Sequence, residues 1–161
     1  MSDFAIYPLA VGDGALALSP IPGRSGAYGA DFARLRDWGP AMVLTMTTQA
    51  ELEKRGATTL GADCATAGID WRHLPIPDFG VPPPAVEAIW PTVSQTAQAH
   101  LRAGRRVLSH CHGGCGRSGM MALRLLVEMG QPPDTALEAL RQVRPCAVET
   151  PEQYAWATLD Y

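Results

Sequence analysis

The sequence has little lysine and no long apolar run. Among 13 lysine and arginine residues only Lys54 is a lysine, and basic residues form no cluster. With 16 acidic residues the formal net charge is −3, which gives no reason to expect nucleic acid or an anionic membrane as a partner. No apolar stretch is long enough to cross a bilayer. Residues 1–4 also lack the basic segment of a signal peptide.

The sequence also contains few cysteines. The chain has four of them, Cys64, Cys111, Cys115 and Cys146, at irregular spacing. This spacing does not indicate a disulfide framework and favours a reducing, cytoplasmic setting. At 161 residues, with 47% hydrophobic and 18% charged residues, we expect a single domain over residues 1–161 with its own core.

Hydrophobic periodicity and turn residues predict alternating strands and helices. Strands are expected at 15–21, 41–46, 69–76 and 106–110. Helices are expected at 31–38, 86–103, 117–130, 134–143 and 151–160, with another beginning after Thr48 in a capping box with Glu51. This order predicts an α/β fold of three layers, in which helices flank a central, mostly parallel sheet of four or five strands. Ligands bind such sheets beyond the carboxyl ends of the strands.

The segment 107–119, VLSHCHGGCGRSG, lies at such an end and carries the most specific signal. It follows a predicted strand and opens a predicted helix. Backbone N–H groups and the helix dipole favour an anion in a loop of this kind. Cys111 lies in the same hollow, where the thiolate is favoured as a nucleophile. Arg117 can bind two phosphate oxygens at once. Together they predict phosphoryl transfer through a cysteine.

The pattern His-Cys-x5-Arg-Ser-Gly resembles the loop of cysteine-dependent protein phosphatases, and in a chain this short it resembles the dual-specificity branch. Segments 47–52, 75–82 and 150–154 are similar to those of the kinase-associated phosphatases within that branch. The resemblance implies the protein-tyrosine-phosphatase fold and hydrolysis of phosphotyrosine, with phosphoserine or phosphothreonine as further substrates. It also implies a phosphocysteine intermediate, a phosphorylated protein as partner, a monomer, and no cofactor or metal.

By this resemblance Cys111 is the expected nucleophile and Arg117 the expected phosphate ligand. The expected phosphate-binding residues are His112, Gly113, Gly114, Cys115, Gly116 and Arg117. The glycines allow positive φ and close approach to phosphate. Ser118 is expected either to donate to the leaving thiolate or to act as a helix N-cap. His110 is expected to support the loop through hydrogen bonds.

Three residues outside the loop complete the expected site. A leaving alkoxide or phenolate needs a proton, and Asp78, in a Pro- and Gly-bounded loop after a strand, is the expected general acid. An ordinary turn is its alternative role, and Asp70 is the second candidate. Gln153 resembles the family glutamine that orients water, although it could equally be a solvent-facing helix residue. The family often has glutamine where this chain has Glu149. Arg24 could help to bind a phosphopeptide, but simple exposure is its favoured role.

Other interpretations compete with this one. Cys115 or Cys64 could form a disulfide with an oxidised Cys111, although packing is the favoured role of both. Adjacent His and Cys residues could suggest zinc, but no second cluster has zinc spacing. A rhodanese-like sulfurtransferase also has a cysteine in an anion-binding loop, and a non-catalytic phosphate-binding module is a further class. A phosphoinositide phosphatase of the same fold is the remaining alternative, which the absence of lysine from the loop disfavours.

Overall fold

A computed structural model describes residues 3–159. Its centre is a five-stranded sheet in the order β1-β2-β5-β3-β4. The strands are β1 (Tyr7–Val11), β2 (Gly14–Ser19), β3 (Met42–Thr45), β4 (Asp70–His73) and β5 (Arg106–His110). The pairs β2–β5, β5–β3 and β3–β4 are parallel, as predicted. The sequence analysis missed β1, which pairs antiparallel with β2. Its short span contains Pro8, a residue that strands tolerate at a sheet edge.

Seven helices lie within residues 3–159. They are α1 (Tyr28–Trp38), α2 (Gln49–Lys54), α3 (Leu60–Thr66), α4 (Pro84–Arg102), α5 (Gly116–Glu128), α6 (Pro133–Val143) and α7 (Pro151–Ala157). All but α3 were predicted, with ends that differ by a few residues. The expected last residue of α7, position 160, lies outside the described residues, as do the ends of the predicted 1–161 domain. The predicted capping box is present: the Thr48 side chain accepts from the Glu51 amide, and the Glu51 carboxylate accepts from the Thr48 amide.

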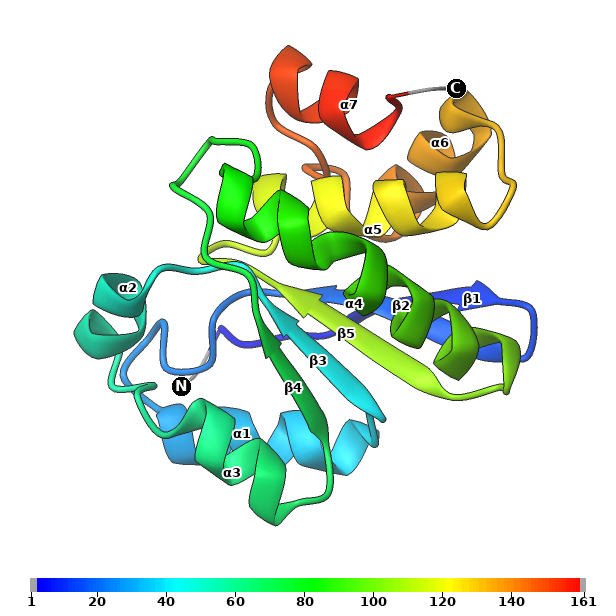
Figure 1. Ribbon diagram of the computed structural model, residues 1–161. Helices are drawn as coiled ribbons and strands as arrows, with labels where there is room; N and C mark the ends of the chain where they lie inside the picture. The colour runs from blue at the N-terminus through cyan, green and yellow to red at the C-terminus, as the bar shows by residue number, and fades with distance from the viewer. Residues whose placement is uncertain (1–2, 160–161) are drawn as a thin grey trace.

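The sheet forms the middle of three layers, with α1 and α3 on one face and α4, α5 and α6 on the other (Figure 1). Successive side chains along each strand point to opposite faces of the sheet, so the strands contribute apolar side chains to the core on both faces. On β2, Leu16 and Leu18 pack toward α4 and α5, whereas Ala17 faces the layer of α1 and α3. On β5, Val107 and Leu108 divide in the same way. Because both faces are covered by helices, these strands are nearly continuous apolar runs in the sequence.

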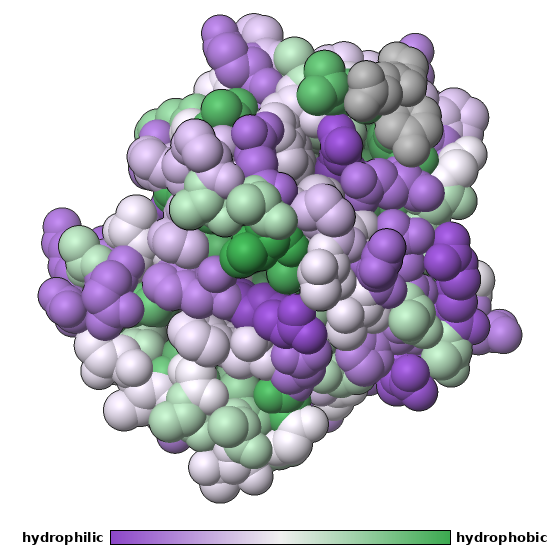
Figure 2. All heavy atoms as spheres, viewed as in Figure 1, coloured by the Kyte–Doolittle hydropathy of each residue, from purple (hydrophilic) through white to green (hydrophobic). Residues whose placement is uncertain are grey.

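The face viewed in Figure 2 is mostly polar or neutral, with apolar spheres gathered between α4 and β4. A groove of about 440 Å³ lies there, lined by residues of β4 and α4. Ile89 on α4 is 45% exposed. Within residues 3–159 no helix combines the length and apolar character that crossing a membrane requires.

The topology brings three segments to the carboxyl edge of the sheet. β5 ends at His110, and α5 begins at Gly116, so residues 111–115 form the loop between them. β3 leads toward α2, and β4 leads into the segment that carries Asp78. Parallel strands place these connections at one edge, as the sequence predicted.

Candidate active site

The carbonyl groups of the candidate phosphate loop accept hydrogen bonds from residues outside the loop. The His112 oxygen accepts from the amide of Ile21 at 3.1 Å. Arg144 donates from Nη2 to the Gly113 oxygen at 2.8 Å and from Nε to the Gly114 oxygen at 3.2 Å. All peptide bonds of residues 3–159 are trans. In a trans peptide the N–H group points opposite to its C=O, so the amides that follow these carbonyls face the hollow of the loop.

Gly114 is the glycine that this loop cannot replace. Its φ is +76°, in the left-handed region that favours glycine. A Cβ atom there would lie 2.6 Å from the carbonyl carbon of Ser19 and 2.8 Å from the nitrogen of Pro20. Both neighbours are backbone atoms and cannot turn aside. Any side chain at this position would therefore push the loop away from β2.

Cys111 is 3% exposed and lies at the base of the hollow. Its Sγ is 3.2 Å from the hydroxyl of Ser118. The alternative role of Ser118 as a helix N-cap is wrong, because Cys115 occupies that position of α5. Ser118 is instead in the first turn, with its hydroxyl directed at the sulfur.

His110 links the loop to the sheet. Its Nδ1 lies 3.3 Å from the Cys111 carbonyl, and its Nε2 lies 2.7 Å from the Thr45 hydroxyl. A carbonyl only accepts, so Nδ1 carries the proton in the neutral ring and Nε2 accepts from Thr45. Burial lowers the pKa of His110 from 6.5 to about 4, against the raising effect of the Cys111 carbonyl. The imidazole is therefore neutral at physiological pH.

Acidification should destabilise the fold through His110. The unfolded chain binds a proton near pH 6.5, whereas the folded chain does so near pH 4. The stabilisation is complete above pH 6.5 and is lost as the pH falls through 4, by about 3 kcal/mol of unfolding free energy. Urea unfolding at several pH values measures it, and His100→Gln, which removes a less buried histidine whose pKa burial also lowers, should keep most of the slope. An NMR titration of the His110 ring with a midpoint near 6.5 would contradict this expectation.

Arg117 is 1% exposed and held by Glu51. Nη1 donates to Glu51 Oε2 and Nη2 to Oε1, both at 2.8 Å, and Nη1 also reaches the Ile76 carbonyl at 2.8 Å. Burial raises the pKa of Glu51, but hydrogen bonds from Arg117 and Thr48 outweigh it and hold the pKa at about 2. Burial also lowers the pKa of Arg117, but Glu51 and the nearby Cys111 and Asp78 charges raise it by more. Sequence analysis found Glu51 only as a capping residue.

One donor of Arg117 has no protein partner. Its Nε atom is buried and makes no hydrogen bond within residues 3–159. A buried guanidinium N–H without an acceptor is costly. The other edge of the guanidinium is already taken by Glu51. An oxyanion bound at the free edge would satisfy the Nε donor, which fits a phosphate site.

Asp78 lines the pocket from the segment that follows β4. Its Oδ1 is 3.2 Å from Arg117 Nη2, and its side chain is 55% exposed. The Gly80 amide donates to the Pro77 carbonyl at 2.8 Å, closing a turn. Phe79 within that turn has a φ of +60°, an uncommon conformation for a bulky residue. The second candidate, Asp70, is paired with Arg72 at 2.8 Å at the start of β4, the end of the strand remote from this loop.

Gln153 is buried at the first turn of α7 and is not solvent-facing. Its Oε1 accepts from the amides of Glu149 and Thr150, and its Nε2 donates to the Gly80 carbonyl at 3.2 Å. It therefore ties the Asp78 loop to α7. A Cβ added at Gly116 would lie 3.0 Å from Gln153 Oε1 and 2.2 Å from Glu149 Oε1, so both side chains lie against the start of α5.

Some of these groups line one pocket of about 290 Å³. It is lined by Arg24, Asp78, Phe79, Cys111, His112, Gly113, Cys115, Arg144 and Glu149. Arg144 was not predicted, Glu149 was noted only as a departure from the family, and exposure was the favoured role of Arg24 over phosphopeptide binding. Its side chain is 39% exposed, yet its Nη1 lies 3.9 Å from the Cβ position of Gly113. His112 accepts from Arg55 at 3.1 Å, and burial, followed by the Arg55 and Arg24 charges, lowers its pKa.

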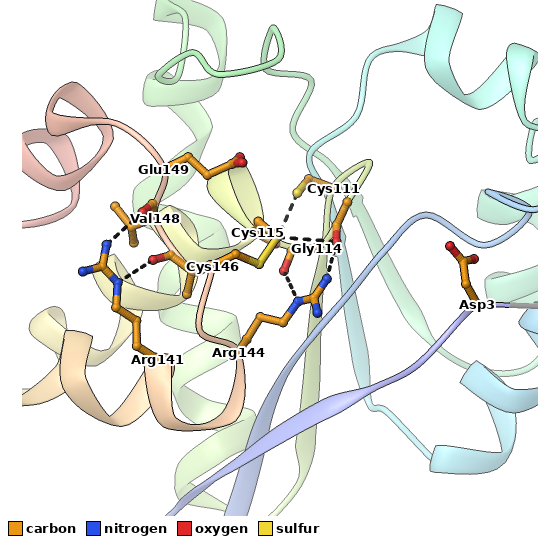
Figure 3. The surroundings of a disulfide bond; sticks show 12 residues. Asp3, Cys111, Gly114, Cys115, Arg141, Arg144, Cys146, Val148 and Glu149 are labelled. Atoms are coloured by element: carbon orange, nitrogen blue, oxygen red, sulfur yellow. Dashed lines mark hydrogen bonds between the residues drawn. A yellow bond between two sulfur atoms is a disulfide. The ribbon is translucent and has the colours of Figure 1, made fainter.

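The cysteines pair differently from both sequence-based alternatives. Cys115 forms a disulfide with Cys146, on the segment between α6 and α7 (Figure 3). The expectation of no disulfide framework was therefore wrong for this pair, as were the favoured packing role of Cys115 and the alternative that pairs it with Cys111. Cys64 is buried in the layer of α1 and α3, and burial, then the Asp63 charge, raises its pKa to about 12. The sequence could not predict this pairing, because a disulfide requires two cysteines to be close in space and Cys115 and Cys146 become close only in the fold.

Comparisons with known proteins agree with this geometry. The fold and loop define a protein of the dual-specificity and tyrosine-phosphatase class. Residues 19–131 match the family model described as "Polymorphic toxin system, DSP-PTPase phosphatase". The chain belongs to this family of cysteine-dependent dual-specificity phosphatases.

Individual relatives support the same assignment. Cyclin-dependent kinase inhibitor 3 of Rattus norvegicus is 34% identical over 127 residues, which cover 77% of this chain and 58% of the relative. The match thus spans little more than half of the relative's length. A structure of the kinase associated phosphatase, with serine replacing its catalytic cysteine, superposes with a TM-score of 0.82 at 26% identity, covering 98% of this chain and 93% of the other. PTPMT1 with PI(5)P has a TM-score of 0.74 at 22% identity, covering 94% and 92%, a likeness of fold.

Proposed function

We propose that this protein hydrolyses phosphotyrosine, and phosphoserine or phosphothreonine, in a phosphorylated protein through a phosphocysteine at Cys111. The observation that supports this most is the proximity of three groups. Cys111 and Asp78 line the same pocket. Arg117 lies behind it, with Nη2 3.2 Å from Asp78 Oδ1 and a buried Nε that has no protein partner within residues 3–159. A nucleophile, an oxyanion ligand and a proton donor are what the reaction requires.

In the first proposed step, the Cys111 thiolate attacks phosphorus, an S–P bond forms and the P–O bond to the substrate breaks. Asp78, protonated, gives its proton to the leaving oxygen. Arg117 and the loop amides bind the three phosphoryl oxygens, and their interaction strengthens as charge spreads in the transition state. His112, Gly113, Gly114, Cys115 and Gly116 supply the backbone of that cradle.

In the second proposed step, water attacks phosphorus and the S–P bond breaks. Asp78, now a carboxylate, takes the proton from water. The Ser118 hydroxyl, 3.2 Å from the sulfur, donates to the departing thiolate, and His110 holds the Cys111 backbone. Gln153 is proposed to guide the water from its place beside Gly116, with the Glu149 carboxylate as its neighbour.

A phosphoprotein is the preferred substrate over a phosphoinositide. Residues 112–116 of the loop contain no lysine that could meet additional ring phosphates. Phe79, which is 60% exposed, lines the pocket and offers an apolar surface to the side chain that carries the phosphate. Aromatic contact of this kind suits a phosphotyrosyl ring.

The proposed active unit is a single domain, and the resemblance to the family implies a monomer. We propose a cytoplasmic location, because the thiol of Cys111 needs reducing conditions to stay active, and in that setting the Cys115–Cys146 disulfide would exchange with cellular thiols. No metal or cofactor is assigned a role in either step.

A direct test compares substrates in the presence of a metal chelator. We expect release of phosphate from a phosphotyrosyl peptide, slower release from phosphothreonyl peptides, and little from phosphoinositide micelles. Acid quenching followed by peptide mapping should find phosphate on Cys111. A faster phosphoinositide reaction would favour that substrate class, and sulfur transfer from thiosulfate to cyanide without phosphate release would favour a sulfurtransferase.

Asp78→Asn should slow the reaction and alter its pH dependence. Because asparagine cannot donate the proton, kcat should fall by about 10²-fold, and the alkaline limb of the pH–rate profile should disappear. The loss should be smaller for an aryl phosphate with an acidic leaving group. Asp70→Asn is the matched control and should keep the profile. An unaltered profile in Asp78→Asn would transfer the acid role to another group.

A further inference from the structure

The outer side of the phosphate loop is fixed by one segment of the chain, residues 144–148. Arg144 binds the carbonyl oxygens of Gly113 and Gly114, and the amide of Val148 donates to the Cys115 oxygen at 3.2 Å. The disulfide from Cys115 to Cys146 adds a covalent link at the same place (Figure 3). Three consecutive carbonyls and one side chain of the loop are thus held by three residues of this five-residue segment.

The fit between the two segments is close. A Cβ added at Gly119 would lie 2.6 Å from the Val148 nitrogen and 3.0 Å from the Ala147 Cα. Val148 itself has a φ of +65° and is 5% exposed. A β-branched residue in this conformation is strained and persists only where its surroundings hold it. The Arg141 guanidinium supplies part of that hold through the carbonyls of Ala147 and Val148, both at 2.9 Å.

The loop has a reason to need such support. Gly113, Gly114 and Gly116 surround Cys115, and glycine loses more conformational freedom on ordering than any other residue. Cys115 has φ −121° and ψ −79°, outside the common strand and helix regions. An unrestrained loop of this composition would be ordered only when an anion binds, and that ordering would weaken binding.

We propose that the Cys115–Cys146 disulfide is a redox-sensitive clasp that preorganises the phosphate loop, so that its opening by a dithiol weakens oxyanion binding. The dithiol reduces the disulfide through a mixed disulfide. The S–S bond breaks, both protein sulfurs become thiols, and the reductant becomes a cyclic disulfide, which balances two electrons and two protons. Cys115 and Cys146 are both partly exposed, so a reductant can reach them.

The clasp also determines which chemistry Cys111 can undergo. While Cys115 is bonded to Cys146, it has no thiol with which to trap an oxidised Cys111. After the clasp opens, the Cys115 thiol becomes available within the loop. The same reduction therefore loosens the phosphate site and frees a second thiol four positions from the proposed nucleophile.

The test measures oxyanion binding, which needs no turnover, although the consequence for catalysis rests on the proposed function. Tungstate affinity is measured by calorimetry on Cys111→Ser protein, with the clasp closed or opened by dithiothreitol, and mass mapping verifies each state. We expect opening to raise the Kd about tenfold, as lost preorganisation predicts. Cys111→Ser/Cys146→Ser should show the weaker Kd without reductant and no response to it. Cys111→Ser/Cys64→Ala is the matched control and should respond like its parent.

Several results would contradict the proposal that the disulfide preorganises the loop. These are an equal Kd in the two states, tighter binding after opening, or no Cys115–Cys146 peptide in the non-reduced protein. In otherwise unaltered protein, Cys146→Ser should raise KM for an aryl phosphate more than it lowers kcat, whereas general loss of structure would lower the active fraction and kcat alone. Tungstate binding that responds to the clasp without any phosphate release would keep the clasp and reject the proposed function.

Discussion

Cys111→Ser should abolish phosphate release while leaving the oxyanion site able to bind. Serine keeps the size and position of the side chain, but its hydroxyl is a far weaker nucleophile than a thiolate at neutral pH. Loss of an enzyme's nucleophile can cost about 10⁶-fold in kcat, so turnover should fall below detection in a stopped assay. Tungstate should still bind, because Arg117 and the loop amides are unchanged.

Cys64→Ala provides the control for this result. Cys64 is the other free cysteine of residues 3–159, and it is buried in the layer of α1 and α3, away from the pocket. Its replacement should leave kcat within about twofold, since it removes only a small apolar contact. Appreciable turnover in Cys111→Ser, or loss of turnover in Cys64→Ala with an intact fold, would mean that the nucleophile is elsewhere.

Arg117→Lys should produce the second-largest loss. Lysine keeps the positive charge, but it cannot present Nε and Nη2 to phosphate while two further N–H bonds hold Glu51. Loss of a preorganised oxyanion donor costs about 10²- to 10³-fold in kcat, and we expect a decrease of at least that size in kcat/KM. Tungstate affinity should fall with it. Steady-state kinetics and calorimetry on the same preparation measure both effects.

Arg124→Lys is the matched control on the same helix. Arg124 donates to Glu128 at 3.0 Å and lies over the Trp156 ring, outside the pocket. It shares helix α5 and an acidic partner with Arg117, so general damage to the helix would appear in both variants. Similar losses in the two variants would show that Arg117 acts through stability and not through phosphate.

The sequence predicted most of the site because the local pattern carries the chemistry. Residues 107–119 contain a strand end, glycines and a helix start, and these features fix where Cys111 and Arg117 lie relative to one another. The strands β2 to β5 were predicted because buried parallel strands are short apolar runs. β1 was missed because it is a short edge strand with a proline, and α3 was missed because it has only 7 residues and no side-chain cap that would mark its start.

Interactions between distant segments were beyond sequence reasoning. The capping box of Thr48 and Glu51 is a local pattern, but the bidentate pair of Glu51 with Arg117 joins residues 66 positions apart. Gln153 was predicted as a functional residue, but the hydrogen bond that it donates to the Gly80 carbonyl became evident only in the fold. Asp78 was already preferred to Asp70 from the sequence, because Asp70 was expected at the start of a strand, and β4 does begin at Asp70.

The sequence alone predicted an anion-binding loop with its cysteine and arginine, and it predicted the layered fold that the structure confirms. These follow from contacts between neighbours in the chain and from hydrophobic periodicity, both of which can be read without coordinates. Tertiary structure alone decided how the loop is braced. Arg144, Val148 and Cys146 reach it from a segment about 30 residues away, and only packing of the α6–α7 connection against α5 brings their donors and sulfur to its carbonyls and to Cys115.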